Sequence, residues 1–569
     1  MLCYDELGQN EFRLLRVHSK KMSTISCELF HASLDHPPPY VAISYAWGDP
    51  RDTENIIISS VEARVTRSLH GALDALRSCK EDIIVWADAV CINQPSQEER
   101  SSQVKKMAYI YKNATSVAIW LGPEEEDSQL AVRFLKLVAE AAGQGCMQTQ
   151  EEVAALIRDG SQVAALVSLF ERPYWKRLWV VQEVLNAARI DVYCGSSTLP
   201  WDVYWKANAV FKQHHSFLDC RFPGSSNKTQ RSFSDALAWC GPGSFPDPRW
   251  PRSGLLRVLR TCRENLASDP RDKVFGLLGV LPDITALTPD YSRTVKEVFT
   301  DVVDYELSTT KRCDVVCEAF PNVGATHMPS WVPDWSLVPP ASSLGLSYQF
   351  DAAPNTEAEF CFSERRNKLT ISAIYLDTVK DHGIAVGTAC RLDDFLVAFC
   401  HARAMLDRNQ VLRSQSTREA FCRALCVRQV PPPYESCWPD ICYHAFSSLQ
   451  QQHLRTIPLD NELIKHAKNR SIMPLESRFT VVEDTCGRRM RGRCLCLTKC
   501  NLIGMGSGLM VPGDIVVIPL GCYTPVLLRR SGLEEWRVVG DVYIDGYMDG
   551  QILKEWEDGK RELAKYKLC

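Results

Sequence analysis

Apolar runs alternate with amphipathic segments along the first 195 residues. Runs rich in β-branched and aromatic side chains predict strands at 40–47, 82–92, 116–122 and 189–195. Apolar residues at helical spacing predict the intervening helices, at 68–79, after Ser96, and at 128–142, 150–170 and 174–188. Buried strands separated by helices are typical of a parallel sheet covered on both faces. The pattern therefore predicts an α/β domain over 40–195.

The remaining segments have a different character. Residues 1–39 are interpreted as an extended lead-in, residues 196–345 as a mixed, helical linker region, and residues 346–569 as an α+β region. Short strand patterns bounded by glycine occur near the C-terminal end, at 513–521, 524–530 and 535–548. Such strands predict a β-rich module there, either a small barrel or a meander.

Composition and charge limit the function classes. Of the 569 residues, 45% are hydrophobic and 24% charged, which is typical of a folded globular protein. The 65 basic and 69 acidic residues give a net charge of -4, so we expect no general nucleic-acid binding. No run approaches the ~20 apolar residues of a membrane span, and the N-terminus lacks the apolar core of a secretory signal. We expect a cytoplasmic protein.

The cysteines support this interpretation without indicating a metal. There are 24 of them, and a reducing compartment keeps thiols free. None belongs to a pair of C-x2-C sequences or to a Cys/His combination with zinc spacing. The glycine-rich motifs of Rossmann and P-loop nucleotide sites are also absent from the sequence. The sequence therefore predicts neither a metal site nor a resident cofactor.

Polar residues follow the first predicted strand, in the sequence Ser44-Tyr-Ala-Trp47-Gly48-Asp49. Parallel sheets place their functional loops at the carboxyl ends of the strands. Gly48 lets the backbone approach a phosphate or ribose, and Asp49 can bond ribose hydroxyls. A Gly-Asp-Pro turn explains the same two residues structurally. Both interpretations stay open at this point.

Asp88 is unusual because it falls inside the second long apolar run. A buried charge is costly unless it is paired. Either Asp88 pairs with Arg100 or Lys105, or it lines a site. Cys91 lies close by, but no histidine occurs within either strand-end motif, so a Cys/His hydrolase is not favoured.

Trp175, Trp179 and Glu183 are spaced four residues apart, which places them on one face of a predicted helix. A carboxylate beside indole rings is partly desolvated, and desolvation raises its pKa toward the range useful for acid–base work. A carboxylate also stabilises the oxocarbenium-like transition state of glycosidic cleavage. The alternative is that both tryptophans are core residues and that Glu183 is the buried partner of an arginine.

The chain resembles the fungal HET domain, named for heterokaryon incompatibility. The resemblance rests on three ordered blocks, YVAISYAWGDP at 40–50, WADAVCINQPSQEERSSQVKKMAYIYKNATSVAIWLG at 86–122 and RPYWKRLWVVQEVLNA at 172–187. The segment ASDPRDKVFGLLG at 267–279 and the strands near the C-terminus are similar to regions that commonly follow this domain. The resemblance implies a TIR-like (flavodoxin-like) parallel α/β fold and a role in non-self recognition and regulated cell death. It also implies other incompatibility proteins, or self-association, as partners.

Some TIR domains cleave NAD at the nicotinamide–ribose bond, with a catalytic glutamate on a helix shortly after a tryptophan. Trp179 and Glu183 hold comparable positions here. The resemblance thus implies an NAD glycohydrolase-like site, with NAD as substrate and Glu183 as the catalytic residue. The pocket residues implied are Ser44, Trp47, Gly48, Asp49, Asp88 and Trp179.

Two other functions stay open in the sequence. The domain can act as a non-catalytic scaffold that binds other proteins of the same pathway. A HET protein can also be recruited to another role, such as secondary metabolism. An open cleft uniting Glu183 with Asp49 or Asp88 would favour the enzyme, and a buried Glu183 paired with arginine would favour the scaffold.

Overall fold

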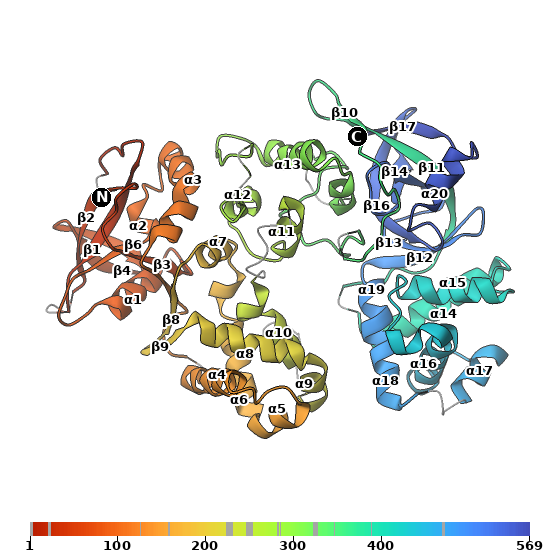
Figure 1. Cartoon of the computed structure of the whole chain (residues 1–569), viewed down its shortest axis with the longest axis horizontal. Helices are drawn as coiled ribbons and strands as arrows, with labels where there is room; N and C mark the ends of the chain where they lie inside the picture. Colours follow the sequence, from red (N-terminus) through yellow and green to blue (C-terminus); the bar gives the residue numbers. More distant parts are fainter. Residues whose placement is uncertain are drawn as a thin grey trace. The chain divides into compact units, whose positions relative to one another are not determined.

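The computed structural model describes residues 4–20, 24–125, 127–157, 160–222, 232–245, 254–281, 284, 286–321, 328–345, 347–388, 390–468 and 473–569. The chain folds into two compact units, residues 1–295 and 296–569 (Figure 1). The boundary between the units falls within the segment that the sequence analysis assigns to a linker region. The division into four segments stays a prediction.

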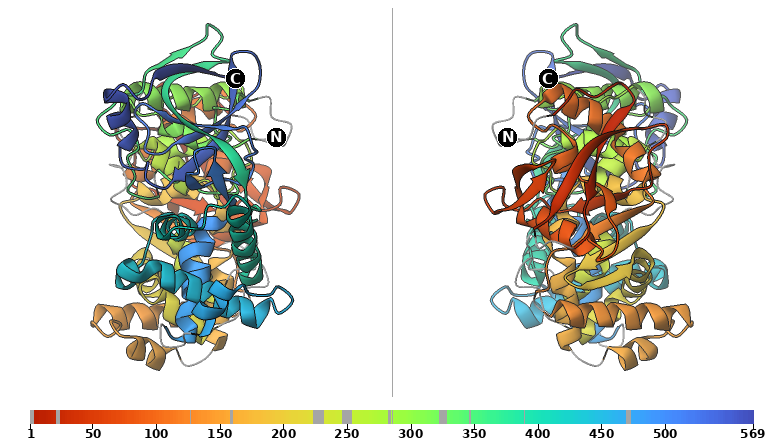
Figure 2. Two further views of the ribbon diagram at one scale, coloured as in Figure 1. Left: turned by 90° about the vertical axis from the view of Figure 1, so that its right-hand side faces the viewer. Right: turned by 90° about the vertical axis from the view of Figure 1, so that its left-hand side faces the viewer.

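A nine-stranded sheet forms the centre of the first unit, with the strand order β5-β4-β2-β1-β6-β3-β7-β8-β9. The strands are β1 (Glu11–Val17), β2 (Ser26–Ser33), β3 (Val41–Tyr45), β4 (Thr53–Ile58), β5 (Val61–Thr66), β6 (Ile83–Trp86), β7 (Ser116–Trp120), β8 (Ile190–Cys194) and β9 (Ser197–Pro200). The α/β class is confirmed. The strands of this unit are also seen in Figure 2, right.

The sheet is mixed rather than parallel, which corrects the expectation from the sequence. Strands β6, β3, β7 and β8 are parallel to one another in the middle of the sheet. Antiparallel neighbours extend it, because β1 pairs with both β2 and β6, and β9 pairs with β8. The segment interpreted as a lead-in supplies β1 and β2. Its apolar residues Phe12, Leu14 and Leu15 are fully buried, so this segment is part of the core.

Two helices connect the central parallel strands. Helix α1 (Arg67–Leu76) precedes β6, and Thr66 caps its N-terminus by accepting a hydrogen bond from the Leu69 backbone. Helix α3 (Gln97–Asn113) leads from β6 to β7, and Ser96 caps it in the same way through Glu99. The chain passes from β3 to β6 in one direction along the sheet and from β6 to β7 in the other. Right-handed connections therefore place α1 and α3 on opposite faces (Figure 1).

Two predicted elements are shorter than expected. The run 82–92 is a strand only over β6, because the chain turns into the short helix α2 (Asp88–Cys91) after Ala87. The predicted helix 174–188 is two elements, the 3-10 helix η1 (Pro173–Lys176) and α7 (Trp179–Leu185). Arg177 has an extended backbone between them and forms a β-bridge with Leu266. Trp175 therefore does not share a helix face with Glu183, as its spacing had predicted.

Helices complete the first unit. They are α4 (Ser128–Gly143), α5 (Gln150–Leu156), α6 (Gly160–Phe170), α8 (Trp201–Gln213), α9 (His215–Arg221), α10 (Phe233–Trp239), η2 (Gly241–Ser244), α11 (Leu255–Thr261) and α12 (Asp272–Leu278). Trp175 lies in an aromatic cluster of this helical part, with its ring near those of Tyr174, Phe170, Trp201, Tyr204 and Phe245. Its interpretation as a core residue is confirmed.

The second unit contains an eight-stranded sheet near the C-terminal end, as the sequence pattern predicts. Its strands are β10 (Phe360–Phe362), β11 (Leu369–His382), β12 (Arg493–Thr498), β13 (Ile503–Ser507), β14 (Ile515–Pro519), β15 (Val526–Arg530), β16 (Glu535–Ile544) and β17 (Leu563–Leu568). The long strand β11 pairs with both β12 and β14, so the path β11-β12-β13-β16-β15-β14 closes on itself. Closure leaves these six strands without a free edge.

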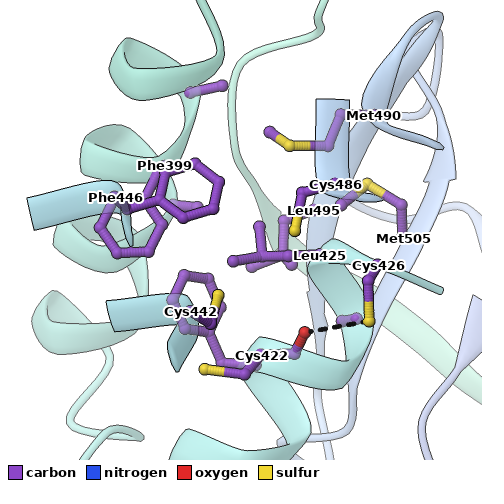
Figure 3. Packing of buried hydrophobic residues seen from close by; sticks show 14 of the residues in the cluster. Phe399, Cys422, Leu425, Cys426, Cys442, Phe446, Cys486, Met490, Leu495 and Met505 are labelled. Carbon is purple, nitrogen blue, oxygen red and sulfur yellow. Dashed lines mark hydrogen bonds between the residues drawn. The ribbon is translucent and has the colours of Figure 1, made fainter. Parts of the chain in front are cut away.

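The helices of the second unit are α13 (Val295–Thr310), η4 (Asp314–Glu318), α14 (Leu392–Arg408), α15 (Gln415–Leu425), η5 (Pro432–Cys437), α16 (Trp438–His453), α17 (Asn461–Lys468), α18 (Leu475–Phe479), the π-helix η6 (Thr480–Gly487), α19 (Arg488–Met490) and α20 (Gln551–Glu557). Those from α14 to α19 surround an apolar core beside the sheet. Phe399 and Phe446 stack in this core with ring centroids 4.3 Å apart (Figure 3). The thiols of Cys422, Cys442 and Cys486 lie in the same apolar cluster.

Each cysteine of the described part of the chain is free, and most are buried. Within those described residues, no group of three or more His, Cys, Asp or Glu side chains is arranged to hold a metal ion. No single helix in the described ranges has both the length and the apolar character needed to cross a membrane.

Candidate functional site

The carboxylate of Glu183 lies in a network of hydroxyl groups at the carboxyl end of β3. The Ser44 hydroxyl donates a hydrogen bond to Glu183 Oε2. The Tyr174 hydroxyl lies 2.8 Å from Ser44 Oγ and donates to it, since the Ser44 proton is already directed to the carboxylate. Glu183 is 2% exposed and Ser44 fully buried. The structure therefore joins two predicted site residues and adds Tyr174.

Local structure explains how Glu183 reaches this position. Helix α7 begins at Trp179, directly after the extended residue Arg177. The guanidinium group of Arg177 donates to the backbone carbonyl of Tyr45, the last residue of β3. The backbone N–H of Leu178 donates to the Leu266 carbonyl at 2.9 Å. These contacts fix the start of α7 beside the end of β3.

The pKa of Glu183 is raised to about 7. Burial is the largest cause, because it disfavours the charged carboxylate. The positive charge of Arg177 and the Ser44 hydrogen bond oppose this effect, and the negative charge of Asp88 adds to it. A carboxyl group with this pKa holds or releases a proton near neutral pH.

Asp88 and Trp47 form the neighbouring part of the site. Trp47 Nε1 donates to Asp88 Oδ2 at 2.9 Å, and Trp47 is 37% exposed. Asp88 is the first residue of α2 and not part of a strand, which corrects its predicted environment. Its carboxylate accepts from this indole and from the Ala89 backbone N–H. No ion pair with Arg100 or Lys105 occurs among the described residues, so the predicted ion pair is wrong.

Gly48 and Asp49 form a turn at the surface. Gly48 has φ +77°, a left-handed conformation that favours glycine. The Asp49 carboxylate accepts hydrogen bonds from the backbone N–H and the guanidinium group of Arg51. Hydrogen bonds from Arg51 lower the pKa of the exposed Asp49 carboxyl group. These contacts are those of a solvent-exposed turn, so the turn accounts for both residues in this conformation.

Trp179 makes its polar contact with a different part of the unit. Its Nε1 atom lies 3.2 Å from Asp272 Oδ2, at the start of α12. The hydroxyl of Tyr291 donates to the other oxygen of Asp272 at 2.6 Å. Trp179 thus connects the helix that carries Glu183 to the SDPRDK segment instead of lining the space between Ser44 and Glu183.

Sequence reasoning missed several residues of the site. Tyr174 and Arg177 lie in the RPYWKR block, where only Trp175 had been considered. Tyr111 is fully buried, its hydroxyl donates to the Ile43 carbonyl at 3.1 Å, and its hydrogen bonding lowers the pKa of Glu183. A polar residue inside an apolar block is the signal that could have identified Tyr174 and Arg177. Nothing in the helix that carries Tyr111 distinguishes it from an ordinary core residue.

The site is closed in this conformation. No ion pair joins Arg177 to Glu183 in the described structure, although their charges interact. A pocket of about 400 Å³ opens beyond the C-terminal end of α7 and is lined by Val184, Leu185, Trp201 and Trp205, among others. Glu183 is not among its lining residues. The carboxylate is therefore separated from this pocket, and a substrate reaches it only after surrounding side chains move.

Two family models match the chain. Residues 40–183 match the heterokaryon incompatibility protein (HET) model, and residues 452–562 match the Het-6 beta-barrel domain. The Neurospora crassa protein called heterokaryon incompatibility protein 6, OR allele, is 24% identical to the chain. That alignment covers 97% of this chain and 96% of the Neurospora protein. No solved structure is significantly similar to the chain.

Proposed function

Because the chain is a HET-domain protein that also carries a Het-6 β-barrel domain, we propose that it acts in fungal non-self recognition. We infer further that its HET domain cleaves NAD once partner binding or self-association has opened the site, and that the outcome is regulated cell death. Glu183 is the proposed catalytic residue. The buried, hydroxyl-bonded carboxylate at the carboxyl end of β3 is the observation that carries this proposal.

The strand order supports a relationship to TIR-like, flavodoxin-like folds. The four central parallel strands come in the chain order β3, β6, β7 and β8, with β4 and β5 of the sheet edge between the first two. Their order in the sheet is β6-β3-β7-β8. This is the 2-1-3-4 order with which flavodoxin-like sheets begin. Ligands bind such sheets at the carboxyl ends of the strands where the order reverses, between the first and third strands. Ser44 and Tyr45, at the end of β3, occupy that position.

The chemistry needs one well-placed carboxylate. Cleavage breaks the bond between ribose C1′ and the nicotinamide nitrogen, and the electron pair leaves with neutral nicotinamide. The ribose carbon gains positive charge, which an ionised Glu183 stabilises. Water then attacks C1′ and loses its proton. Since nicotinamide is cationic before cleavage, no acid has to protonate the leaving group.

The predicted pocket residues have definite roles in this scheme. The half-exposed Trp47 offers an aromatic face to the nicotinamide ring, and Asp88 holds the Trp47 indole. Gly48 lets the backbone approach the ribose, and Asp49 bonds ribose hydroxyls after leaving Arg51. Trp179 supports α7 from the opposite side, through Asp272.

Burial explains why activity depends on assembly. A carboxylate that is 2% exposed is closed to a dinucleotide. Opening must separate groups that now cover it, and binding to a partner or a second copy supplies the free energy for that change only if it favours the open form. Cells that contain the protein without its partner then keep their NAD.

A non-catalytic scaffold is the second candidate, and the same burial favours it. The carboxylate is satisfied by Ser44 and lies near the positive charge of Arg177, as a structural network does. In this alternative the HET domain recruits other proteins of the pathway, and Glu183 only stabilises the fold.

NAD loss separates the two candidates in cells that express this chain with its self-association forced by a fused dimerisation domain. The variants are Glu183→Gln, which keeps the shape of the side chain, and Glu183→Ala. Glu98→Gln is the matched control, because Glu98 is an exposed glutamate of α3. NAD content, survival and the amount of folded protein are measured for each. The enzyme predicts that wild type and Glu98→Gln deplete NAD and kill, whereas both Glu183 variants accumulate normally and do neither.

Two outcomes would contradict NAD cleavage. Killing without NAD loss would support the scaffold. Failure of both Glu183 variants to accumulate, together with unchanged NAD in wild-type cells in which self-association is forced by a fused dimerisation domain, would assign Glu183 a structural role.

A further inference from the structure

The SDPRDK segment is the part of the first unit that the proposed function leaves without a role. Its Asp269 carboxylate binds the Arg271 guanidinium through both oxygens, and Arg271 also donates to the backbone carbonyls of Tyr291 and Arg293. Lys273 is buried and donates to the Arg263 and Asn265 carbonyls. These contacts tie the segment, residues 268–273, to the loops before and after it in the chain. Within the segment, Asp272 is the residue that contacts α7, the helix that carries Glu183.

Asp272 joins three elements of the unit. It opens α12, accepts the indole N–H of Trp179 on α7 at 3.2 Å, and accepts the Tyr291 hydroxyl at 2.6 Å. The Arg100 guanidinium from α3 lies over the Tyr291 ring, 4.2 Å from its centroid. Asp272 is 8% exposed, and its pKa is raised to about 6, chiefly by burial.

The packing of α12 along α7 connects the Trp179–Asp272 hydrogen bond to the position of Glu183. Gly276 of α12 lies against Leu178, and a Cβ atom at Gly279 would clash with Gln182 Oε1. Asn186 donates to the Gly279 carbonyl at 3.3 Å. Helix α12 therefore borders α7 along its length, while Glu183 projects to Ser44. A shift of α7 against α12 would move the carboxylate.

We propose that Asp272 is a positioning residue for Glu183, which it serves by holding Trp179 on α7, and that protonation of Asp272 weakens this hold. The functional part of this proposal rests on the proposed NAD cleavage. An ionised Asp272 accepts from both Trp179 and Tyr291. A protonated Asp272 donates to the Tyr291 hydroxyl and still accepts from Trp179, but a hydrogen bond to a neutral carboxyl group is weaker than one to a carboxylate.

The groups that face Asp272 set the direction of its pKa. Burial raises the pKa first, and the negative charge of Asp269 in its own segment also raises it. The hydrogen bonds from Tyr291 and Trp179 lower it, as does the positive charge of Arg100 on α3. Removing the Tyr291 hydroxyl therefore raises the pKa of Asp272 further.

Hydrogen–deuterium exchange of the full chain, followed by mass spectrometry, tests the hold on α7. Peptides covering residues 179–186 are compared between pH 5 and 8, with rates corrected for the intrinsic effect of pH. In wild type we expect exchange of α7 to accelerate as pH falls through about 6. Asp272→Asn should exchange several-fold faster at pH 8 and show no pH step, and Tyr291→Phe should move the step to higher pH.

Asp290→Asn is the matched control, because Asp290 is a partly exposed aspartate whose carboxylate accepts hydrogen bonds from the backbone and hydroxyl of Ser292 and makes none to Asp272 or Trp179 among the contacts of the described residues. It should keep the wild-type profile. Two results would contradict the proposal that Asp272 holds Trp179 on α7. One is a wild-type exchange rate that shows no step with pH, and the other is the same step in Asp272→Asn. If Asp272→Asn does not fold, Tyr291→Phe decides alone. A pH step that moves to higher pH supports the proposal, and a step that stays or moves to lower pH contradicts it.

The rate of NAD cleavage then tests whether the Asp272–Trp179 contact positions the Glu183 carboxylate. Misplacing a catalytic group by about 1 Å can cost about 100-fold in rate. In cells where wild type depletes NAD, Asp272→Asn should slow the loss at least about tenfold at equal protein level. Unchanged NAD loss in that variant would overturn the positioning role. If wild type does not deplete NAD, the proposed function fails, and the exchange profile still decides whether Asp272 holds α7.

Discussion

The hydroxyl group of Ser44 donates a hydrogen bond to the carboxylate of Glu183, although 139 residues separate them in the chain. Ser44 is buried near the end of β3, and Glu183 is buried on α7. A buried carboxylate is stable only where donors or opposite charges replace its lost hydration. The bond therefore ties the two ends of the segment that matches the HET model to each other, and it fixes where the carboxylate lies.

Replacing Ser44 by alanine should destabilise the first unit and raise the pKa of Glu183. The substitution leaves a buried acceptor without its donor, which costs about 1–3 kcal/mol of unfolding free energy. The loss should be larger at pH 8 than at pH 5, because the ionised carboxylate needs the donor more. Urea unfolding at both pH values measures this. Tyr174→Phe is the control that keeps the Ser44–Glu183 bond, and an equal loss for Ser44→Ala at both pH values would contradict the prediction.

The raised pKa of Glu183 gives the stability a defined pH dependence. The folded carboxyl group has a pKa of about 7, against 4.5 in its ordinary environment. Between these values the folded protein binds more protons than the unfolded chain, so the unfolding free energy falls as pH rises through this window. The slope contributed by one group is at most about 1.4 kcal/mol per pH unit.

Glu183→Gln should remove that contribution. The variant cannot ionise at this position, so its unfolding free energy should vary less between pH 4.5 and 7 than that of wild type. Relative to wild type, the variant should therefore gain stability as pH rises. Unfolding curves at several pH values for both proteins measure the difference. Parallel pH profiles would show that Glu183 titrates at its ordinary pKa.

The sequence predicted the central strands because their apolar runs are long and end at glycine or a polar cluster. It did not reveal that β1 and β2 belong to the same sheet, since the pairing of β1 with β6 joins residues about 70 positions apart. The register of such a pair depends on tertiary contacts and leaves no local pattern. The sequence pattern therefore could not predict that the sheet is mixed.

The candidate site was predicted in part for a similar reason. Chemical type identified Glu183, Ser44, Trp47 and Asp88 as polar or aromatic residues near strand ends and on α7. Their partners depend on side-chain directions that periodicity does not give. Trp179 turns to Asp272, and Asp88 accepts from Trp47, because α7 begins only after the extended residue Arg177 and α2 begins at Asp88.

Thiol labelling should separate the cysteines by exposure. Cys79, Cys146, Cys361 and Cys500 are exposed, whereas Cys422, Cys426, Cys442 and Cys486 lie in the apolar core of the second unit. Burial also raises the pKa of Cys426 and Cys442 well above the ordinary value, which suppresses the reactive thiolate. Iodoacetamide and peptide mapping should modify the first four cysteines in the native protein and the core group only in urea. Rapid native labelling of the core group would contradict this packing.

A buried ion pair in the second unit should be the most sensitive charged contact there. Arg493 and Asp541 lie 2.7 Å apart, with side chains 2% and 0% exposed, and Asp541 also accepts from the Leu344 backbone. Asp541→Ala leaves the Arg493 charge buried without its partner and should cost about 3–5 kcal/mol of unfolding free energy. Replacing both residues by apolar ones of similar size should cost less than this single change, because no charge stays buried. Asp558→Ala breaks the exposed pair with Lys560 and, as the control, should cost less than about 1 kcal/mol. Urea unfolding of the three variants and wild type measures these differences. Equal losses for Asp541→Ala and Asp558→Ala would show that water reaches the Arg493–Asp541 pair.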